Sequence, residues 1–130
     1  CYKTEVGPNF DNSVSSLLED LESRGLLSTT MVLAFGEFGR TPKINPAGGR
    51  DHHPGCWTVL MGGGPVKGGR IVGQSDEIGY APKDRPVSTA EIAATVFQGL
   101  GISLDTELSG PQSRPLRIVD HGVEPIQELF

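Results

Sequence analysis

Two short apolar runs, each bounded by glycine-rich or threonine-rich segments, most constrain how this chain can fold. Residues 30–35 read TMVLAF and residues 56–61 read CWTVLM. Runs of this length are shorter than most helices and are typical of strands buried on both faces, as in a parallel sheet. Three glycines at positions 62–64 follow the second run and are expected to end it. A further short strand is expected at residues 70–73.

Two other segments have the pattern of amphipathic helices. From residue 11 or 13 to residue 24, apolar side chains recur at spacings of three and four, and Gly25 follows as a stop signal. A second helix is predicted to begin at a capping box, in which Ser88 and Glu91 each accept a hydrogen bond from the other's backbone N–H. Gly99 or Gly101 is expected to close that helix.

The order of these elements is helix, strand, loop, strand, hairpin, helix, which is an α/β pattern. The last 29 residues have no clear periodicity apart from one short strand predicted at residues 116–119. Glycine and proline make up about 22% of the 130 residues. This is just below the roughly 25–30% that indicates disorder, so we expect a folded, loop-rich chain.

Charge and residue usage exclude several classes of function. The chain has 11 basic and 16 acidic residues, whereas binding to nucleic acid requires clustered Lys and Arg. No apolar run approaches the roughly 20 residues of a transmembrane helix. Two cysteines, Cys1 and Cys56, exclude a disulfide-dense scaffold. Because the first residue is Cys and not Met, we expect residues upstream of it; a lipid-carrying terminal Cys is the alternative.

The loop between the two apolar runs carries most of the chemically useful side chains. It follows a predicted strand, and ligands of α/β sheets bind beyond the carboxyl ends of strands. Glu37, Asp51 and two of the three histidines lie in it, and these side chains are ligands for zinc or another divalent ion. Arg40 and Arg50 suit phosphate or sulfate oxyanions. A surface loop held by structural ion pairs is the alternative.

Several short motifs in this order resemble a known bacterial family. They are GEFGRTP at residues 36–42, GRDH at residues 49–52, GGG at residues 62–64 and KGG at residues 67–69. The combination resembles the domain of unknown function numbered fifteen hundred and one, whose members are often labelled sulfatases. The resemblance runs from residues 8–11 to residues 125–130. It implies a relative of the alkaline phosphatase superfamily, whose members hydrolyse sulfate or phosphate esters at a metal site on an α/β sandwich.

The resemblance also implies roles for individual residues. Glu37 lies where metal-dependent relatives place an Asp at the end of a strand, and Phe38 replaces their neighbouring metal-binding His. Asp51 and His52 match the Asp-His pair of the family, whereas the position of His53 is usually aromatic. The implied ligands of a divalent ion, which is zinc, calcium or magnesium, are therefore Glu37, Asp51 and His52.

Two arginines complete the implied site. Arg40 and Arg50 would steady the oxyanion of a sulfate or phosphate ester, carried by a small molecule or a glycan. Family members carry an upstream Trp-Asp-Thr-His segment that resembles a pair of metal ligands, and the nucleophile of the superfamily belongs to the N-terminal half. Residues 1–130 are therefore expected to be the C-terminal segment of one alkaline-phosphatase-like domain, with strands of a larger mixed or parallel sheet, and to be inactive alone.

Three functional hypotheses follow. The first is a metal-dependent hydrolase of sulfate or phosphate esters, of which this chain is a part. The second is a non-catalytic binding or structural module, exported to the periplasm or cell surface as many family members are; Phe38 in place of a ligand His favours it. The third is a small autonomous domain, which would keep an open sheet edge and a risk of aggregation.

Two motifs have simpler explanations than a binding site. The stretch GGGPVKGG at residues 62–69 resembles a phosphate-binding loop, but Lys67 is followed by Gly and not by the Ser or Thr that holds magnesium. Turns around a strand end explain these glycines. Asp120 and His121 precede Gly122 in the C-terminal tail, where a solvated turn is expected.

Overall fold

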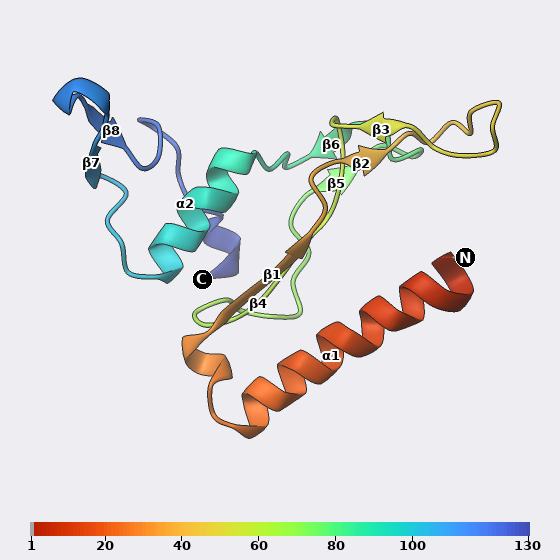
Figure 1. Ribbon diagram of the computed structural model, residues 1–130, viewed down its shortest axis with the longest axis horizontal. Helices are drawn as coiled ribbons and strands as arrows, with labels where there is room; N and C mark the ends of the chain where they lie inside the picture. Colours follow the sequence, from red (N-terminus) through yellow and green to blue (C-terminus); the bar gives the residue numbers. More distant parts are fainter. Residues whose placement is uncertain (1) are drawn as a thin grey trace.

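A computed structural model describes residues 2–130 as a mixture of helices and short strands (Figure 1). Cys1, and with it the prediction of a lipid-carrying terminus, lies outside these residues. The α-helices of the described chain are α1 (Gly7–Ser23) and α2 (Thr89–Gly99). Its longest strands are β1 (Met31–Phe35) and β4 (Val59–Gly63). The predicted mixed α/β character is confirmed.

The remaining strands are two or three residues long and pair with one another. The pairs are β2 (Gly39–Arg40) with β3 (His52–His53), β5 (Gln74–Ser75) with β6 (Pro82–Asp84), and β7 (Glu107–Ser109) with β8 (Pro115–Arg117). Short π- or 3₁₀-helical turns lie at Tyr2–Val6, Leu27–Thr29, Pro111–Ser113 and Gln127–Leu129. Within residues 2–130, no helix combines the length and apolar character that a membrane span requires.

The two apolar runs form one antiparallel pair, so the prediction that they are parallel strands buried on both faces is wrong. Met31 of β1 lies opposite Gly63 of β4, and the register continues to Phe35 opposite Val59. The connection between them, residues 36–58, holds the β2–β3 hairpin and no helix, whereas the crossover of a parallel pair usually contains a helix. Phe35, at the end of β1, is 62% exposed.

The second apolar strand also lies later in the chain than predicted. It spans Val59–Gly63 and includes two of the three glycines that were expected to end it. Gly62 pairs with Val32 inside the strand, and an added Cβ there would lie at an ordinary contact distance of 3.7 Å from Leu18 of α1. Gly63 and Gly64 then turn the chain, with φ of +73° and +57°. Turns are therefore the observed role of these glycines, as predicted.

Helices α1 and α2 lie on opposite sides of the β1–β4 pair (Figure 1). Leu18 of α1 approaches Gly62, which pairs with Val32. Gly99 of α2 approaches the neighbouring strand residue, Met31, so closely that an added Cβ would lie 2.3 Å from its sulfur. Because successive strand residues point to opposite faces, the two helices cover different faces of the sheet.

Helix α1 ends where the sequence predicts but begins earlier. The backbone N–H of Leu26 donates to the Leu21 carbonyl at 2.8 Å and that of Gly25 to the Glu22 carbonyl at 2.9 Å, while Gly25 has a φ of +70°. This is the Schellman arrangement that glycine favours. The helix begins at Gly7 because Pro8, at its first turn, has a φ suited to helix and needs no N–H partner there.

The capping box of α2 is confirmed. The Ser88 hydroxyl accepts from the Glu91 backbone N–H at 3.1 Å, and the Glu91 carboxylate accepts from the Ser88 backbone N–H at 2.7 Å. Past the end of the helix, the Gly101 N–H donates to the Gln98 carbonyl at 2.9 Å, and Gly101 has a φ of +73°. Both ends of α2 therefore follow from local sequence signals.

Two minor strands were predicted with different success. The prediction of a strand at residues 70–73 is wrong. Gly73 has a φ of +82°, and strand β5 begins only after it, at Gln74. The strand expected at residues 116–119 is present in part, as β8 (Pro115–Arg117). It pairs with β7, which had not been predicted. Directly after β8, the Ile118 N–H donates to the carbonyl of Thr106, the residue directly before β7, at 3.1 Å.

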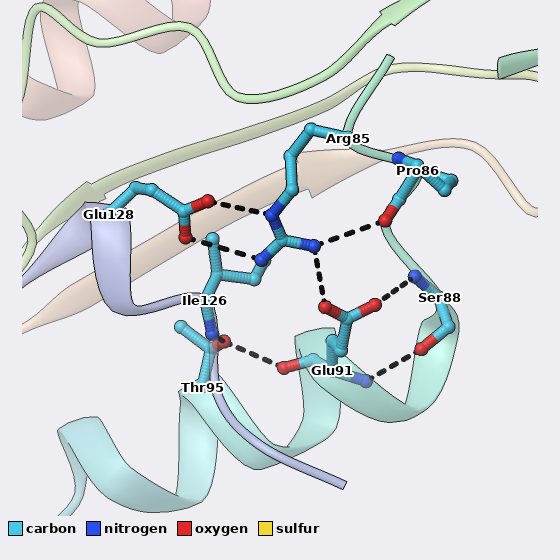
Figure 2. A network of polar contacts seen from close by, with 7 residues as sticks. All are labelled: Arg85, Pro86, Ser88, Glu91, Thr95, Ile126 and Glu128. Atoms are coloured by element: carbon cyan, nitrogen blue, oxygen red, sulfur yellow. Dashed lines mark hydrogen bonds and ion pairs between the residues drawn. The ribbon is translucent and has the colours of Figure 1, made fainter. Parts of the chain in front are cut away.

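Arg85 joins the C-terminal segment to the beginning of α2 (Figure 2). Its guanidinium donates to the two carboxylate oxygens of Glu128, at 2.6 Å from Nε and 3.2 Å from a terminal nitrogen, and to the Glu91 carboxylate at 2.7 Å. One turn into the helix, the Thr95 hydroxyl donates to the Glu91 carbonyl at 2.6 Å and accepts from the Ile126 N–H at 2.9 Å. These contacts dock residues 126–128 on α2.

The ion pair with Arg85 makes the stability of the protein sensitive to acid. The hydrogen bonds from Arg85 lower the pKa of Glu128 from 4.5 to about 2. A carboxyl whose pKa is lowered by folding stabilises the folded state above its unfolded pKa and loses this effect as the pH falls. We therefore expect the Glu128→Gln variant to show a shallower fall in stability between pH 4.5 and about pH 2, measured by urea denaturation across that range.

Replacement of the other partner is the check on this expectation. Arg85→Gln removes the guanidinium from both Glu128 and Glu91, so it should make the acid dependence at least as shallow as Glu128→Gln does, and adding Glu128→Gln to it should change little. If both single variants keep the acid dependence of the unchanged protein, the Arg85–Glu128 pair does not contribute to it.

Much of the apolar surface of this chain is exposed to solvent. Its solvent-accessible surface is 9302 Å², whereas a compact monomer of the same mass exposes about 6,600 Å². Among the described residues, the buried apolar side chains are Ala94, Val119 and Ile126. Large apolar side chains lie exposed on several elements, and Ile71 is 95% exposed. The described chain thus has only a small core of its own.

Candidate functional site

The candidate site is the β2–β3 hairpin, which follows β1 directly. Gly39 pairs with His53 and Arg40 with His52, so the loop of residues 41–51 closes the hairpin. In an antiparallel pair, opposite residues share a face and neighbours along a strand alternate. Arg40 and His52 therefore lie on one face of the hairpin, and His53 lies on the other.

Asn45 organises the loop of this hairpin. Its side-chain oxygen accepts from the backbone N–H groups of Ala47 at 3.1 Å and Gly49 at 2.9 Å, and its side-chain nitrogen donates to the Asp51 carboxylate at 2.8 Å. The Thr41 hydroxyl accepts from the Asp51 backbone N–H at 3.0 Å. The exposed Asp51 carboxylate is therefore oriented by the loop itself.

A shallow open hollow of about 440 Å³ lies beside this loop. Its lining is polar in part and includes Thr41, Lys43, Asn45 and Asp51. The Lys43 ammonium group and the Asp51 carboxylate give the hollow one side chain of each charge.

The two predicted oxyanion-binding arginines have structural contacts as well. A terminal nitrogen of Arg50 donates to the carbonyl oxygens of Thr41 at 2.7 Å and Pro42 at 2.5 Å. A terminal nitrogen of Arg40 lies 3.4 Å from the Arg50 carbonyl oxygen. Both side chains are exposed. Arg50 thus holds the two sides of the loop together, and binding of an oxyanion by either arginine stays a prediction.

His52 stacks on Phe38, a contact that the motif comparison did not predict. The two ring centroids are 3.9 Å apart with an angle of 29° between the planes. The Arg40 guanidinium carbon lies 5.4 Å from the centroid of the Phe38 ring. Because Phe38 and Arg40 are two residues apart and His52 lies opposite Arg40, strand alternation alone would have placed all three side chains on one face.

His53 occupies the other face and is buried. Its Nε2 lies 2.5 Å from the carbonyl oxygen of Tyr80, and its ring centroid is 4.6 Å from that of the Tyr80 side chain. A carbonyl oxygen only accepts hydrogen bonds, so Nε2 carries the proton in this contact. Of the two histidines, only His52 is exposed; that His52 and not His53 is a metal ligand stays a prediction.

The predicted metal ligands do not form a complete site within the described chain. Asp51 and His52 are consecutive and both exposed, and Glu37 is exposed before β2. Across residues 2–130, no group of three or more His, Cys, Asp or Glu side chains is arranged to hold a metal ion. An ion bound at this hairpin would therefore need ligands from beyond the described chain, and the set of Glu37, Asp51 and His52 stays a prediction.

The other motifs are placed away from this hairpin. Asp120 and His121 are exposed in the C-terminal part of the chain, in a turn closed by the Val123 N–H, which donates to the Asp120 carbonyl at 3.2 Å. Lys67 does not face a phosphate-binding cradle, because its ammonium group donates to the Phe130 carbonyl at 2.7 Å. The simpler interpretations of both motifs agree with these positions.

Comparison with known proteins identifies the family and leaves its activity open. No curated protein and no solved structure matches the chain. The family whose model matches is described as "Protein of unknown function (DUF1501)", and the match covers residues 2–130. The motifs GEFGRTP and GRDH lie in the β2–β3 hairpin and its approach, so the residues that carried the resemblance are those of the candidate site. The chain belongs to this family of unknown function.

Proposed function

We propose that the intact protein is a metal-dependent hydrolase of sulfate or phosphate esters and that the β2–β3 hairpin contributes to its active site. One observation carries this proposal: Arg40 lies opposite His52 in the hairpin, and the Asp51 carboxylate immediately precedes His52. A cation that suits a tetrahedral oxyanion thus lies opposite an imidazole in the hairpin, and a carboxylate is the adjacent residue of the chain; imidazole and carboxylate are both common metal ligands. The three side chains are exposed, so a substrate can reach them.

The residues of this chain would bind and orient the ester. The Arg40 guanidinium would donate hydrogen bonds to the non-bridging oxygens of the sulfate or phosphate group, where charge gathers in the transition state. Asn45 holds the Asp51 carboxylate in place from the loop. A divalent ion, when bound, would supply Lewis acidity at the ester oxygen. Zinc, calcium and magnesium all accept carboxylate oxygens, and zinc is the one that most often takes imidazole nitrogen.

We also infer that this chain is one segment of a larger domain. Its surface exceeds that of a compact monomer by a wide margin, and its β1–β4 sheet has two strands although helices lie on both faces. A two-stranded sheet is marginally stable by itself. An alkaline-phosphatase-like sandwich, with further strands beside β1 or β4, would cover this surface and supply the remaining ligands.

Removal of the candidate ligands tests the metal site. In the intact protein, Asp51→Ala and His52→Ala are each expected to weaken the binding of Zn²⁺ by at least about tenfold, because each removes a group that contacts or orients the ion. His121→Ala removes an exposed histidine outside the hairpin and serves as the control, with unchanged affinity expected. Titration calorimetry with Zn²⁺ measures both. Unchanged affinity in both hairpin variants would remove Asp51 and His52 from the site.

A second candidate function is a non-catalytic binding or structural module. Phe38 favours it, because this residue stands where metal-dependent relatives of the family are expected to have a ligand His. The two functions predict different results when the metal-loaded intact protein is mixed with chromogenic sulfate and phosphate esters. Turnover that is lost in Arg40→Ala supports the hydrolase. A folded, metal-loaded protein that releases no product from either ester supports the module.

A further inference from the structure

His53 joins two hairpins that are distant in the sequence. It lies on the face of β3 opposite His52, is 9% exposed, and its Nε2 donates to the Tyr80 carbonyl oxygen at 2.5 Å. Tyr80 belongs to the turn between β5 and β6, 27 residues further along the chain. This contact therefore fixes the candidate site hairpin against a second, independently built turn.

The Tyr80 carbonyl is held in place by Asp76. The Asp76 carboxylate accepts from the backbone N–H groups of Tyr80 at 2.7 Å and Ala81 at 3.3 Å, and the Asp76 N–H donates to the Ala81 carbonyl at 2.9 Å. The pKa of Asp76 is lowered below its usual value, mainly because its carboxylate accepts the hydrogen bond from the Tyr80 N–H. The turn thus presents a fixed acceptor to His53.

Two glycines leave the room that this contact needs. An added Cβ at Gly55 would lie 2.9 Å from His53 Nε2 and 3.4 Å from the Tyr80 carbonyl oxygen, directly beside the hydrogen bond. An added Cβ at Gly39 would lie 3.2 Å from the His53 carbonyl oxygen. A larger residue at position 55 would therefore crowd the His53 ring at its hydrogen bond, and one at position 39 would crowd the His53 backbone.

We propose that His53 is a positioning residue, which ties β3 to the turn of residues 76–81 and thereby holds His52 stacked on Phe38. His52 is the next residue of the same two-residue strand, and its ring lies 3.9 Å from that of Phe38 on the exposed face. Because the two histidines share one short strand, a shift of β3 away from Tyr80 moves the His52 ring off Phe38. That the held His52 is a metal ligand rests on the proposed function; the positioning role does not.

The stacking itself provides a signal that reports this role without any metal or substrate. Because the two ring centroids are 3.9 Å apart, the protons of the His52 ring are expected to be shifted upfield by the ring current of Phe38. In the intact protein, with ¹³C-labelled histidine rings and the His52 signal assigned from His52→Gln, we expect His53→Phe to move this signal toward the position of a free histidine. His53→Gln retains an N–H donor near the place of Nε2 and is expected to keep the signal near its original position.

A second variant keeps the test decisive if His53→Phe does not fold. Gly55→Ala leaves His53 in the chain but places a methyl group against its Nε2, so the His52 signal should move in the same direction. Gly68→Ala, where an added Cβ meets nothing within 4 Å, is the matched control and should leave the signal unchanged. If both His53→Phe and Gly55→Ala fold and leave the His52 signal in place, the proposal is wrong.

Measurements of Zn²⁺ affinity distinguish a failure of the positioning role from a failure of the proposed function. If His52 is a ligand, His53→Phe should weaken Zn²⁺ binding about 10- to 100-fold, as the loss of a group that orients a ligand does, and His53→Gln should restore most of the affinity. If the unchanged protein binds none of Zn²⁺, Ca²⁺ and Mg²⁺, the metal-dependent hydrolase is overturned. A shifted His52 signal in His53→Phe would in that case still support the positioning role.

Discussion

The Gly39→Ala variant is expected to lose about 3 kcal/mol of unfolding free energy, the upper part of the usual range for an added methyl group in a closed space. An added Cβ at Gly39 would lie 1.9 Å from the carbonyl oxygen of Cys56 and 3.2 Å from that of His53. Both obstacles are backbone atoms, which cannot rotate away as a side chain can. Strand β2 would therefore have to separate from the segment around residue 56. Urea denaturation of the intact protein measures the loss.

Gly36→Ala is the matched control for this variant. Gly36 lies in the same connection, three residues earlier, and an added Cβ there would meet only the Phe38 carbonyl oxygen, at an ordinary 3.6 Å. We expect its stability to change by less than about 0.5 kcal/mol, as for surface substitutions without special contacts. Equal losses in the two variants would show that the close approach of Gly39 to Cys56 is not the cause.

The second large effect is expected at Thr95 on helix α2. Thr95 is fully buried at 0% exposure, and its hydroxyl joins the Glu91 carbonyl to the backbone N–H of Ile126, which is itself 3% exposed (Figure 2). Valine has the same shape without the hydroxyl. Thr95→Val therefore leaves the Ile126 N–H without a partner, and an unpaired buried donor costs about 1–3 kcal/mol. We expect a loss of about 2 kcal/mol in thermal or urea unfolding.

Thr89→Val, on the first turn of the same helix, controls for the change of residue type. Thr89 is exposed, so the same substitution should change stability by less than about 0.5 kcal/mol. Hydrogen exchange adds a local measurement: in Thr95→Val, the Ile126 amide should exchange faster, because its acceptor is gone. An unchanged exchange rate at Ile126 would mean that the C-terminal segment is held on α2 by its other contacts.

The end of α1 and both ends of α2 could be predicted from the sequence because they depend on residues within about one turn; the start of α1, at Gly7, was predicted too late. The capping box joins Ser88 and Glu91, three residues apart, and Gly25 ends α1 through bonds to residues three to five positions away. Propensity, capping and glycine conformation act over this distance. The direction of β1 against β4 has no such local signal, since apolar runs of this length fit parallel and antiparallel pairing equally well.

The candidate site shows the same division between local and distant contacts. Its residues were identified from sequence motifs. Once the hairpin is known, strand alternation places Phe38, Arg40 and His52 on one face. The sequence does not distinguish the two adjacent histidines by burial. His53 is buried because Tyr80, 27 residues away, supplies a carbonyl acceptor, and no local rule connects the two.

The sequence by itself determined the end of α1, both ends of α2, the glycine turns, the family and the loop that carries Arg40, Asp51 and His52. Only the tertiary structure decided which apolar strands pair and in which direction, which histidine faces inward, and that Arg85 meets Glu128 across 43 residues of sequence. The physical reason is the separation in sequence over which each interaction acts. Backbone conformation and capping depend on near neighbours, whereas strand pairing, burial and ion pairs depend on residues that only the folded chain brings together.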